Sequence, residues 1–466
     1  MNYSTEMTNE AAGAIVGMLE VMVQKERETG GKTPTIAQVE NEMREMLRQI
    51  GQEALSLFLN SQQGTPSSEI ACRCGGRLKY QRMRPATVIS VFGKVGYERA
   101  YYGGCECGKG LAPVDEAFGI EPGHVTAGLG TLLALAGIAF SYEESAKWLR
   151  AYLMFDISEN TVRSETEKMG ALQEEQEGKL MARSQEYDYV LERRRQPRAI
   201  PARLYGSIDA AKVRIEPRPK KGEEKEEHED WRDMKVLCWF ETEEVPPAQR
   251  SARHRVKIDR QQLPLRAKNM RYFCDIAEAA TFGNLLWATG CAVLADVCPD
   301  LVFLGDGASW IWNLVNHHYP HAVQIVDWYH AEEHLETVAR DAFSSWLDQT
   351  AWLEQTTQSL WDGDVEDVIR SCQSLASVSL EASLAVTYFS NNRERMRYHL
   401  FRAAGYMIGS GTIESACKQI ISHRLKLPGA QWVVDGAVYT AKARAAWLSG
   451  SWLPLCAQRS ALPLAA

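Results

Sequence analysis

The chain has 466 residues, of which 45% are hydrophobic and 13 are tryptophan. This length and composition predict a globular protein of two to four domains with substantial cores. The net charge of −8 excludes a general positive field that would attract nucleic acid, so any such contact must come from local basic patches. The odd number of cysteines, 11, fits a reducing cytosol, and the longest apolar run, Leu129–Phe140, is too short to span a membrane. No signal peptide opens the chain, so we expect a soluble, cytoplasmic protein without membrane contact.

Residues 1–68 are predicted to form an N-terminal helical region that ends in a linker. The second of two expected helices opens with Thr35 as N-cap, and Gln38 completes a capping box. The polar segment Ser61–Ser68 is the linker by its composition. A small helical subdomain or a dimerisation arm is the expected role of this region.

Residues 69–120 are predicted to form a basic β ribbon that two cysteine pairs bracket, Cys72 with Cys74 and Cys105 with Cys107. Four thiolates beside glycines indicate a zinc ribbon with tetrahedral, structural Zn²⁺. The C-x-C spacing, however, points two sulfurs to opposite faces of an extended chain unless a turn intervenes. Free buried cysteines are therefore the alternative. The basic side chains suit phosphate contacts or a solvated face.

Residues 121–198 are predicted to be helical. They contain a helix, a short turn and a second helix capped by Ser158, which is the arrangement of a helix-turn-helix. Arg163, on the first turns of the second helix, would then contact DNA. A helical hairpin without DNA is the alternative. The region ends in a charged segment, residues 192–198, that we interpret as a hinge.

Residues 199–330 are predicted to begin an α/β domain in the order β–β–β–α–β–α–β, which is that of an RNase H-like fold with a mixed five-stranded sheet. The expected elements are strands Arg203–Ile215, Met234–Glu241 and Met270–Asp275, helix Ala277–Leu294, and strands Leu301–Leu304 and Ala322–Val326. Asp209 lies in the first strand, Asp306 just past the fourth and Asp327 just past the fifth. In such a sheet the first and fourth strands are central neighbours, so the first two carboxylates would meet at one edge.

A helical insertion, residues 331–390, separates these acids from the last region, residues 391–466. There Glu414 follows a glycine-rich turn and begins a helix. Three acids could hold two Mg²⁺ ions for phosphoryl transfer, whereas each acid alone could simply cap a loop or a helix. Basic residues around Glu414 could contact a nucleic-acid backbone, namely Arg395, Arg397, Lys418, Arg424 and Lys426.

Four motifs together resemble the ISKra-type insertion sequence transposases, relatives of the Mutator-like transposases. They are Ile208-Asp209-Ala-Ala-Lys, Gly305-Asp306-Gly-Ala-Ser-Trp-Ile, Asp327-Trp-Tyr-His330 and Gly409-Ser-Gly-Thr-Ile-Glu414-Ser, and the likeness runs from about Cys72 to Ala437. The resemblance implies a DDE transposase that depends on Mg²⁺ or Mn²⁺, with an RNase H-like domain and a helical insertion. It implies catalytic roles for Asp209, Asp306 and Glu414, and auxiliary roles for Asp327 and His330.

The same resemblance implies that the N-terminal zinc-ribbon and helix-turn-helix region binds the terminal inverted repeats of a mobile element. Target DNA is the second expected partner. Because two element ends must be held together, we expect a homo-oligomer, a dimer or larger synaptic complex, associated with the nucleoid.

Two rival hypotheses remain at this stage. The first is a zinc metalloprotease, because His330-Ala-Glu-Glu-His334 also reads H-x-x-E-H, with Glu333 as general base. The second is a catalytically inactive, transposase-derived DNA-binding protein whose acids no longer work.

Overall fold

The computed structural model describes residues 35–195, 199–216, 230–252, 264–409 and 411–461, together with the isolated positions Gly13, Val16, Gly17 and Glu20. The chain divides into two compact units. One comprises Met1–Met169 and Leu453–Ala466, and the other comprises Gly170–Trp452. The predicted first N-terminal helix and the end of the predicted hinge, residues 196–198, lie outside the described residues.

The first unit opens with the long helix α2 (Ile36–Ser61), which begins where the sequence predicts. Its capping box is confirmed, because Thr35 Oγ1 accepts from Gln38 N at 3.4 Å while Gln38 Oε1 accepts from Thr35 N at 2.8 Å. Helix α2 packs on an antiparallel three-stranded sheet in the order β1-β2-β3. These strands are β1 (Glu69–Ala71), β2 (Arg77–Ser90) and β3 (Gly93–Gly103).

Helices complete the first unit. They are α3 (Pro113–Phe118), α4 (Ala127–Ala139), α5 (Tyr142–Leu153), the start of α6 (Glu159–Ser184) and most of α19 (Trp452–Ala461). The predicted helix, turn and helix are present as α5, residues 154–158 and α6. Ser158 Oγ accepts from Thr161 N at 3.1 Å, which is the predicted cap. Apolar residues of α4, α5 and α6 form a shared core that includes Leu133, Leu149 and Val162.

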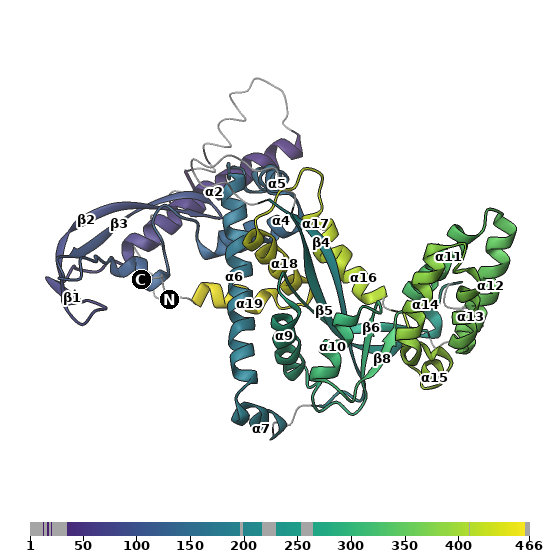
Figure 1. Ribbon diagram of the computed structural model, residues 1–466. Coiled ribbons are helices and arrows are strands. Elements are labelled where there is room, and N and C mark those ends of the chain that lie inside the picture. Colours follow the sequence, from purple (N-terminus) through teal and green to yellow (C-terminus); the bar gives the residue numbers. More distant parts are fainter. Residues whose placement is uncertain are drawn as a thin grey trace. The chain divides into compact units, whose positions relative to one another are not determined.

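The second unit is built on a mixed five-stranded sheet in the order β6-β5-β4-β7-β8, as Figure 1 shows in part. The strands are β4 (Leu204–Ile215), β5 (Asp230–Glu244), β6 (Leu265–Asp275), β7 (Leu301–Gly305) and β8 (Val323–Val326). β4, β5 and β6 pair antiparallel, while β4, β7 and β8 pair in parallel. The predicted mixed sheet is therefore confirmed, with the first and fourth strands adjacent.

Helices and short helical turns surround this sheet. They are the rest of α6, α7 (Tyr187–Arg195), η1 (Pro247–Gln249), α9 (Ala279–Ala292), α10 (Ser309–His318), α16 (Gly411–Cys417), the π-helical η3 (Lys418–Ser422), α17 (His423–Leu425) and α18 (Val434–Leu448). The middle of strand β5, Val236–Phe240, is buried without interruption. Because successive side chains of a strand point to opposite sides, both faces of β5 are covered there. Trp239 Nε1 donates to Thr289 Oγ1 of α9 at 3.0 Å, while the neighbouring Phe240 stacks on Tyr205.

A buried ion cluster joins α6, β6 and α18. Lys442 is 2% exposed, and its Nζ lies 2.5 Å from Glu177 Oε2 and 3.1 Å from Asp275 Oδ2. Burial raises the pKa of Glu177, and the Lys442 ammonium opposes that rise. Because a charge in the interior is costly without a partner, the buried Lys442 and Glu177 depend on each other.

The predicted helical insertion, residues 331–390, lies within a longer run of helices, Trp328–Ala403, between β8 and α16 (Figure 1). Its helices are α11 (Trp328–Ala342), α12 (Trp346–Asp362), α13 (Val365–Leu375) and α14 (Leu380–Asn392), followed by η2 (Arg393–Met396) and α15 (Tyr398–Ala403). The two ends of the insertion meet, because Trp328 N donates to Ile408 O at 2.9 Å. The chain thus returns to the sheet close to where it left.

Candidate active site and cysteine cluster

The central strands place two of the predicted acids at the same level of the sheet. β4 and β7 run parallel, and their last paired residues are Ser207 and Leu304. Asp209 and Asp306 each lie two residues beyond that pair, at the carboxyl end of β7. Neighbouring strands are about 4.8 Å apart, so the two side chains begin from adjacent positions. This is the edge at which open α/β sheets collect functional groups.

The loop that carries Asp306 is held by the helical insertion. Asp306 Oδ1 accepts from Ala308 N at 2.8 Å, and Gly307 has a φ of 101°, which favours glycine. From α14, Tyr388 donates its hydroxyl to the Asp306 carbonyl oxygen at 2.8 Å, and Asn392 Nδ2 donates to the Gly307 carbonyl oxygen at 3.3 Å. The insertion therefore orients the second acid directly.

The carboxylate of Asp209 contacts both its own strand and α16. Its Oδ1 accepts from Ala210 N at 2.7 Å, and its Oδ2 lies 3.3 Å from the Cys417 thiol, which donates to it. Burial raises the pKa of Asp209, and repulsion from Asp306 adds to the rise, whereas the two hydrogen bonds and His330 oppose it. Cys417 lies one helical turn after Glu414, so this contact brings the third acid's helix to β4.

Asp327 is the N-cap of α11, the first helix of the insertion. It is fully buried, and its Oδ1 accepts from Tyr329 N at 2.6 Å and from His330 N at 3.0 Å. Its own N–H donates to the Gly305 carbonyl oxygen at 2.8 Å, which ties the start of α11 to the end of β7. The half-buried His330 is thereby fixed beside the same edge of the sheet, with its Nδ1 3.7 Å from Glu333 Oε2.

Glu414 belongs to the same electrostatic group. Partial burial raises its pKa, repulsion from Asp327 and Asp209 adds to the rise, and His330 and Lys418 oppose it. The residues that the sequence singled out therefore influence one another in pairs: Asp209 with Asp306 and His330, and Glu414 with Asp327, His330 and Asp209. Sequence reasoning missed Tyr388, Asn392 and Cys417, since no local pattern marks a residue that contacts an acid from a distant helix.

Asp209, Asp306 and Glu414 offer oxygen donors of the kind that hard divalent cations take, but the structure does not gather the three within 4.8 Å of one another. Carboxylate oxygens are the ligands that Mg²⁺ and Mn²⁺ prefer, and mutual repulsion among the acids is what a bound cation relieves. Among the residues the structure describes, only the four cysteines gather three or more potential ligand atoms within 4.8 Å of one another. Ligands of a two-metal site need not be so close, since the ions themselves lie about 4 Å apart.

The H-x-x-E-H motif, His330–His334, has no third potential zinc ligand close to it among the described residues. Within the described part of the chain, His330, Glu333 and His334 form no group of ligand atoms of the kind that the cysteines form. The ring of His334 instead stacks on Tyr388, with centroids 3.9 Å apart. Tyr388 is the residue that holds the Asp306 loop, so His334 supports that loop by packing.

The basic residues predicted to contact DNA fall into two classes. Arg397, Lys418 and Lys426 are exposed, as a phosphate contact requires. Arg395 is half-buried, with its Nε donating to Gln324 Oε1 at 2.8 Å, and Arg424 is only 2% exposed. Their surroundings favour packing roles: the guanidinium of Arg395 lies over the Trp312 ring, and that of Arg424 over the Trp432 ring. Arg163 is partly exposed near the start of α6.

The four cysteines of the first unit form a compact cluster. Cys72 Sγ lies 3.4 Å from Cys74 Sγ and 3.6 Å from Cys107 Sγ, and Cys74 Sγ lies 3.4 Å from Cys105 Sγ. A tetrahedron with Zn–S bonds of about 2.3 Å has edges of about 3.8 Å, so these atoms are nearly placed for one metal ion. A hydrogen bond from the Gly76 N–H is the main reason that the pKa of Cys74 falls to about 7. A thiolate of this kind is a ready metal ligand.

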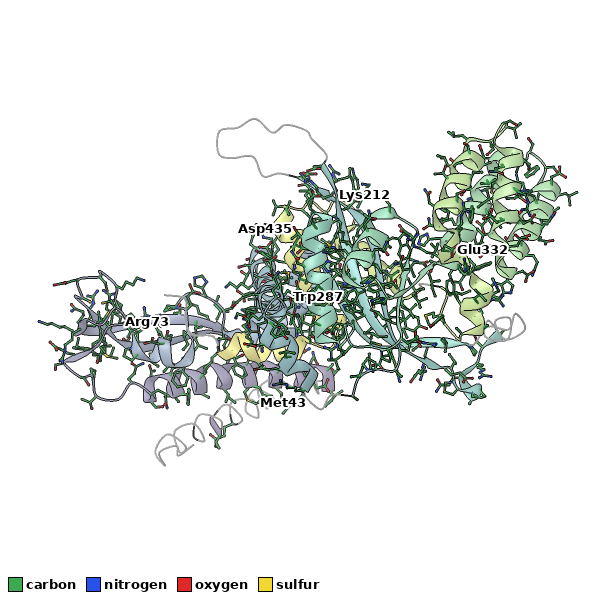
Figure 2. The ribbon with its side chains drawn as sticks, turned by 60° about the horizontal axis from the view of Figure 1, so that its bottom comes forward. Met43, Arg73, Lys212, Trp287, Glu332 and Asp435 are labelled. Atoms are coloured by element: carbon green, nitrogen blue, oxygen red, sulfur yellow. The ribbon has the colours of Figure 1, made fainter. Side chains whose placement is uncertain are left out.

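Two turns overcome the difficulty of the C-x-C spacing. Gly75 N donates to Cys72 O at 2.9 Å, and Gly108 N donates to Cys105 O at 2.9 Å. Both glycines have positive φ, 89° and 71°, a conformation that side chains disfavour. Arg73, labelled in Figure 2, lies between the first two cysteines and pairs with Glu116 at 2.5 Å. The cluster could therefore hold a metal such as zinc.

Comparison with known proteins gives one family match. Residues 33–191, about a third of the chain, match the model of an uncharacterised protein family, UPF0236. No curated protein matches the chain. Among the helices that the structure describes, none combines the length and apolar character needed to cross a membrane.

Proposed function

We propose that this chain is a DDE-type DNA transposase that cleaves and joins DNA at the ends of an insertion sequence with Mg²⁺ or Mn²⁺. The observation that supports the proposal is the position of Asp209 and Asp306 at matching places on the paired strands β4 and β7, together with the electrostatic influence of Asp306 on Asp209 and of Asp209 on Glu414. The strand order β6-β5-β4-β7-β8, with the acid-bearing strands adjacent, supports an RNase H-like catalytic domain.

In this proposal the three acids hold the divalent cations. When bound, such cations would polarise the scissile phosphodiester and neutralise charge on the attacking and leaving oxygens. Asp306 keeps its orientation through the Tyr388 and Asn392 contacts to its loop, and Asp209 keeps its orientation through Ala210 N and the Cys417 thiol. Side chains held in this way favour a preorganised site, which lowers a barrier because less reorganisation is needed.

Two further groups have roles toward the DNA backbone. The backbone N–H of His330 donates to Asp327 at the start of α11, and the His330 imidazole can donate a hydrogen bond to a phosphate oxygen or keep an acid oriented. The exposed ammonium groups of Lys418 and Lys426 and the guanidinium of Arg397 can contact phosphates flanking the scissile bond. Carboxylates are the proposed catalytic groups throughout, so no covalent protein–DNA intermediate is expected.

The first unit would supply recognition of the element ends. In this proposal α5 and α6 act as a helix-turn-helix with Arg163 toward DNA, and Zn²⁺ on the four cysteines stabilises the β ribbon. A dimer or larger assembly would hold two ends together, in the cytoplasm beside the nucleoid. Target DNA is the second substrate.

The test uses duplex DNA carrying the sequences that flank the coding region on both sides, incubated with the full chain and Mg²⁺ or Mn²⁺. Asp209→Asn, Asp306→Asn and Glu414→Gln should each lower strand cleavage by at least about 100-fold while DNA binding persists. Glu333→Gln is the matched control, because this exposed glutamate lies beside His330 and should leave cleavage unchanged. Cleavage at the wild-type rate in the three acid variants would refute the proposal.

The same assay separates the rival functions. A chain that binds the flanking DNA with unchanged affinity in all variants, and never cuts it, would be a DNA-binding descendant. Peptide cleavage abolished by Glu333→Gln, with Asp306→Asn fully active, would instead identify a metalloprotease.

A further inference from the structure

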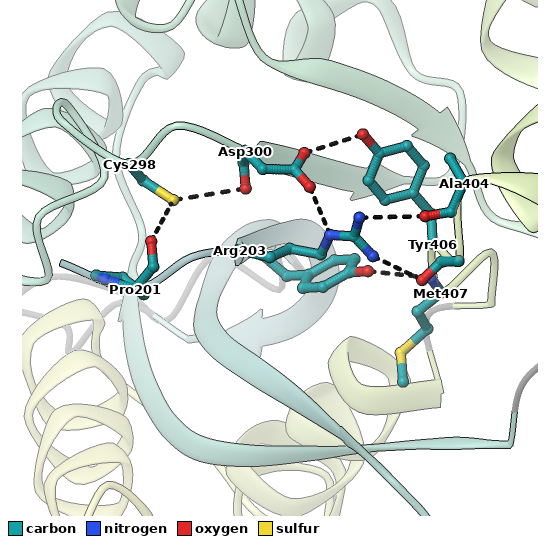
Figure 3. Close-up of polar contacts among 9 residues, drawn as sticks. Pro201, Arg203, Cys298, Asp300, Ala404, Tyr406 and Met407 are labelled. Carbon is teal, nitrogen blue, oxygen red and sulfur yellow. Dashed lines mark hydrogen bonds and ion pairs between the residues drawn. The ribbon is translucent and has the colours of Figure 1, made fainter.

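Figure 3 shows a polar cluster around Arg203, Asp300 and Tyr406. It lies where β4 and β7 begin, whereas Asp209 and Asp306 follow the last paired residues of these two strands. Arg203 and Asp300 come directly before β4 and β7, whose first residues, Leu204 and Leu301, are paired. Arg203 Nε donates to Asp300 Oδ2 at 2.6 Å. Because the strands run in parallel, Asp209 and Asp306 follow Arg203 and Asp300 after the same number of residues, six.

The cluster also holds the segment that leads to the third acid. Arg203 Nη1 donates to Gly405 O at 2.7 Å, and Arg203 Nη2 donates to Ala404 O at 3.1 Å. Tyr406 then donates its hydroxyl to Asp300 Oδ1 at 2.9 Å, and its ring lies 4.2 Å below the Arg203 guanidinium. Glu414 follows eight residues after Tyr406.

The bonds of Arg203 depend on the shape of its side chain. One planar guanidinium joins a carboxylate on β7 and two carbonyl oxygens of the returning segment, while its face covers a ring. The side chains of Arg203 and Asp300 are 29% and 26% exposed, so solvent weakens these bonds only in part. A lysine offers a point charge without a planar fork and cannot reproduce the set.

We infer that Arg203, Asp300 and Tyr406 form a clamp that positions the three acid-bearing segments relative to one another. The clamp is a feature of the fold, while its catalytic meaning rests on the function proposed above. A misplacement of about 1 Å far from the chemistry can lower a rate about 100-fold, so a clamp distant from the acids can still govern them.

The clamp should act mainly on Glu414. β4 and β7 are already held in register by their own hydrogen bonds, so Asp209 and Asp306 have a second source of alignment. The segment before α16 has fewer such bonds, chiefly Met407 N to the Tyr205 hydroxyl at 3.1 Å and Ile408 O to Trp328 N at 2.9 Å. Loosening the clamp should therefore mobilise α16 and leave the sheet intact.

The test combines hydrogen exchange with metal titration of the full chain. Arg203→Lys removes the fork, and Tyr406→Phe removes one hydroxyl while keeping the ring. Arg266→Lys is the matched control, because Arg266 bonds Glu243 at 2.5 Å and Gln249 at 2.8 Å in β5 and its following turn, away from the acids. Amide exchange in Gly411–Cys417 should accelerate about tenfold in both clamp variants, with exchange in β5 and β6 unchanged.

The Mg²⁺ concentration for half-maximal strand cleavage should rise several-fold in the clamp variants and stay constant in Arg266→Lys. Unchanged exchange of Gly411–Cys417 in both clamp variants would overturn the clamp, whatever the enzyme's activity. Accelerated exchange in a chain that never cleaves DNA would uphold the clamp as a positioning device of α16 and count against the proposed function alone.

Discussion

Replacing Lys442 by methionine tests the buried ion cluster of the second unit. The substitution keeps most of the side-chain volume and leaves Glu177, which is 3% exposed, without the ammonium that lies 2.5 Å away. Asp275 is 27% exposed and can be solvated, so the cost falls on Glu177. Glu177 can avoid this cost by taking up a proton. Protonating a carboxyl of ordinary pKa 4.5 at pH 7 costs about 3.4 kcal/mol, at about 1.36 kcal/mol per pH unit, so the loss of stability in the variant is at most about that size.

The cost has a defined pH dependence. In the variant the folded-state pKa of Glu177 lies further above the unfolded value of 4.5, since the opposing ammonium is gone. A raised carboxyl pKa favours the folded state at low pH, and this advantage is lost as pH rises. The deficit of Lys442→Met relative to wild type should therefore shrink as the pH is lowered from about 7.5 to about 5.5.

Urea unfolding followed by tryptophan fluorescence at three pH values measures this deficit. Lys442→Met/Glu177→Gln is the companion variant, because it also removes the Glu177 carboxylate, which the single substitution leaves buried without its partner. It should recover most of the lost stability and show no added pH dependence. A deficit that is constant with pH, or a double variant as unstable as the single one, would refute the reasoning.

Three further predictions concern other parts of the chain. The purified chain should carry about one zinc ion by atomic emission, and Cys74→Ser should lose it; a wild-type chain free of zinc after expression in zinc-rich medium would contradict the metal site. Burial lowers the pKa of His318 from 6.5 to about 4, so the stability this histidine contributes is complete above pH 6.5 and is lost toward pH 4. The loss is at most roughly 3 kcal/mol before solvent screening, and His318→Phe should flatten that part of the pH profile of thermal melting. Lys426→Ala should lower the slope of log binding constant against log salt concentration for DNA by about one unit, because one phosphate contact is lost. Arg424→Ala should lower the melting temperature and leave that slope unchanged, because Arg424 is buried. Equal slopes in wild type and Lys426→Ala would exclude the Lys426 contact.

The sequence was sufficient to predict the sheet and the position of its acids. A short apolar run that ends in an acid, such as the one before Asp306, predicts a buried strand. In a parallel sheet the acid then lies at the carboxyl end of that strand. Asp209 and Asp306 therefore appear where the alternation of strands and helices places them. The capping signals at Thr35 and Ser158 were equally local, and both are confirmed.

What the sequence could not supply are contacts between distant segments. Tyr388 meets Asp306 across 82 positions and Arg203 meets Gly405 across 202, and no periodicity encodes such pairs. A count of positive charges also cannot separate a buried arginine from an exposed one, as Arg424 shows. The C-x-C pairs were ambiguous for a related reason, since turns at Gly75 and Gly108 decide where the sulfurs point.

The hydrogen bond between Trp328 and Ile408 joins the two ends of the helical bundle beside the five-stranded sheet. An inserted bundle whose two ends are hydrogen-bonded to each other can gain or lose helices without changing the distance between those ends. The sheet is affected only by the two ends of the insertion, and not by the length of chain between them. Size variation among related chains should therefore concentrate in α12 and α13, while α14 keeps its length because Tyr388 and Asn392 must still reach the Asp306 loop.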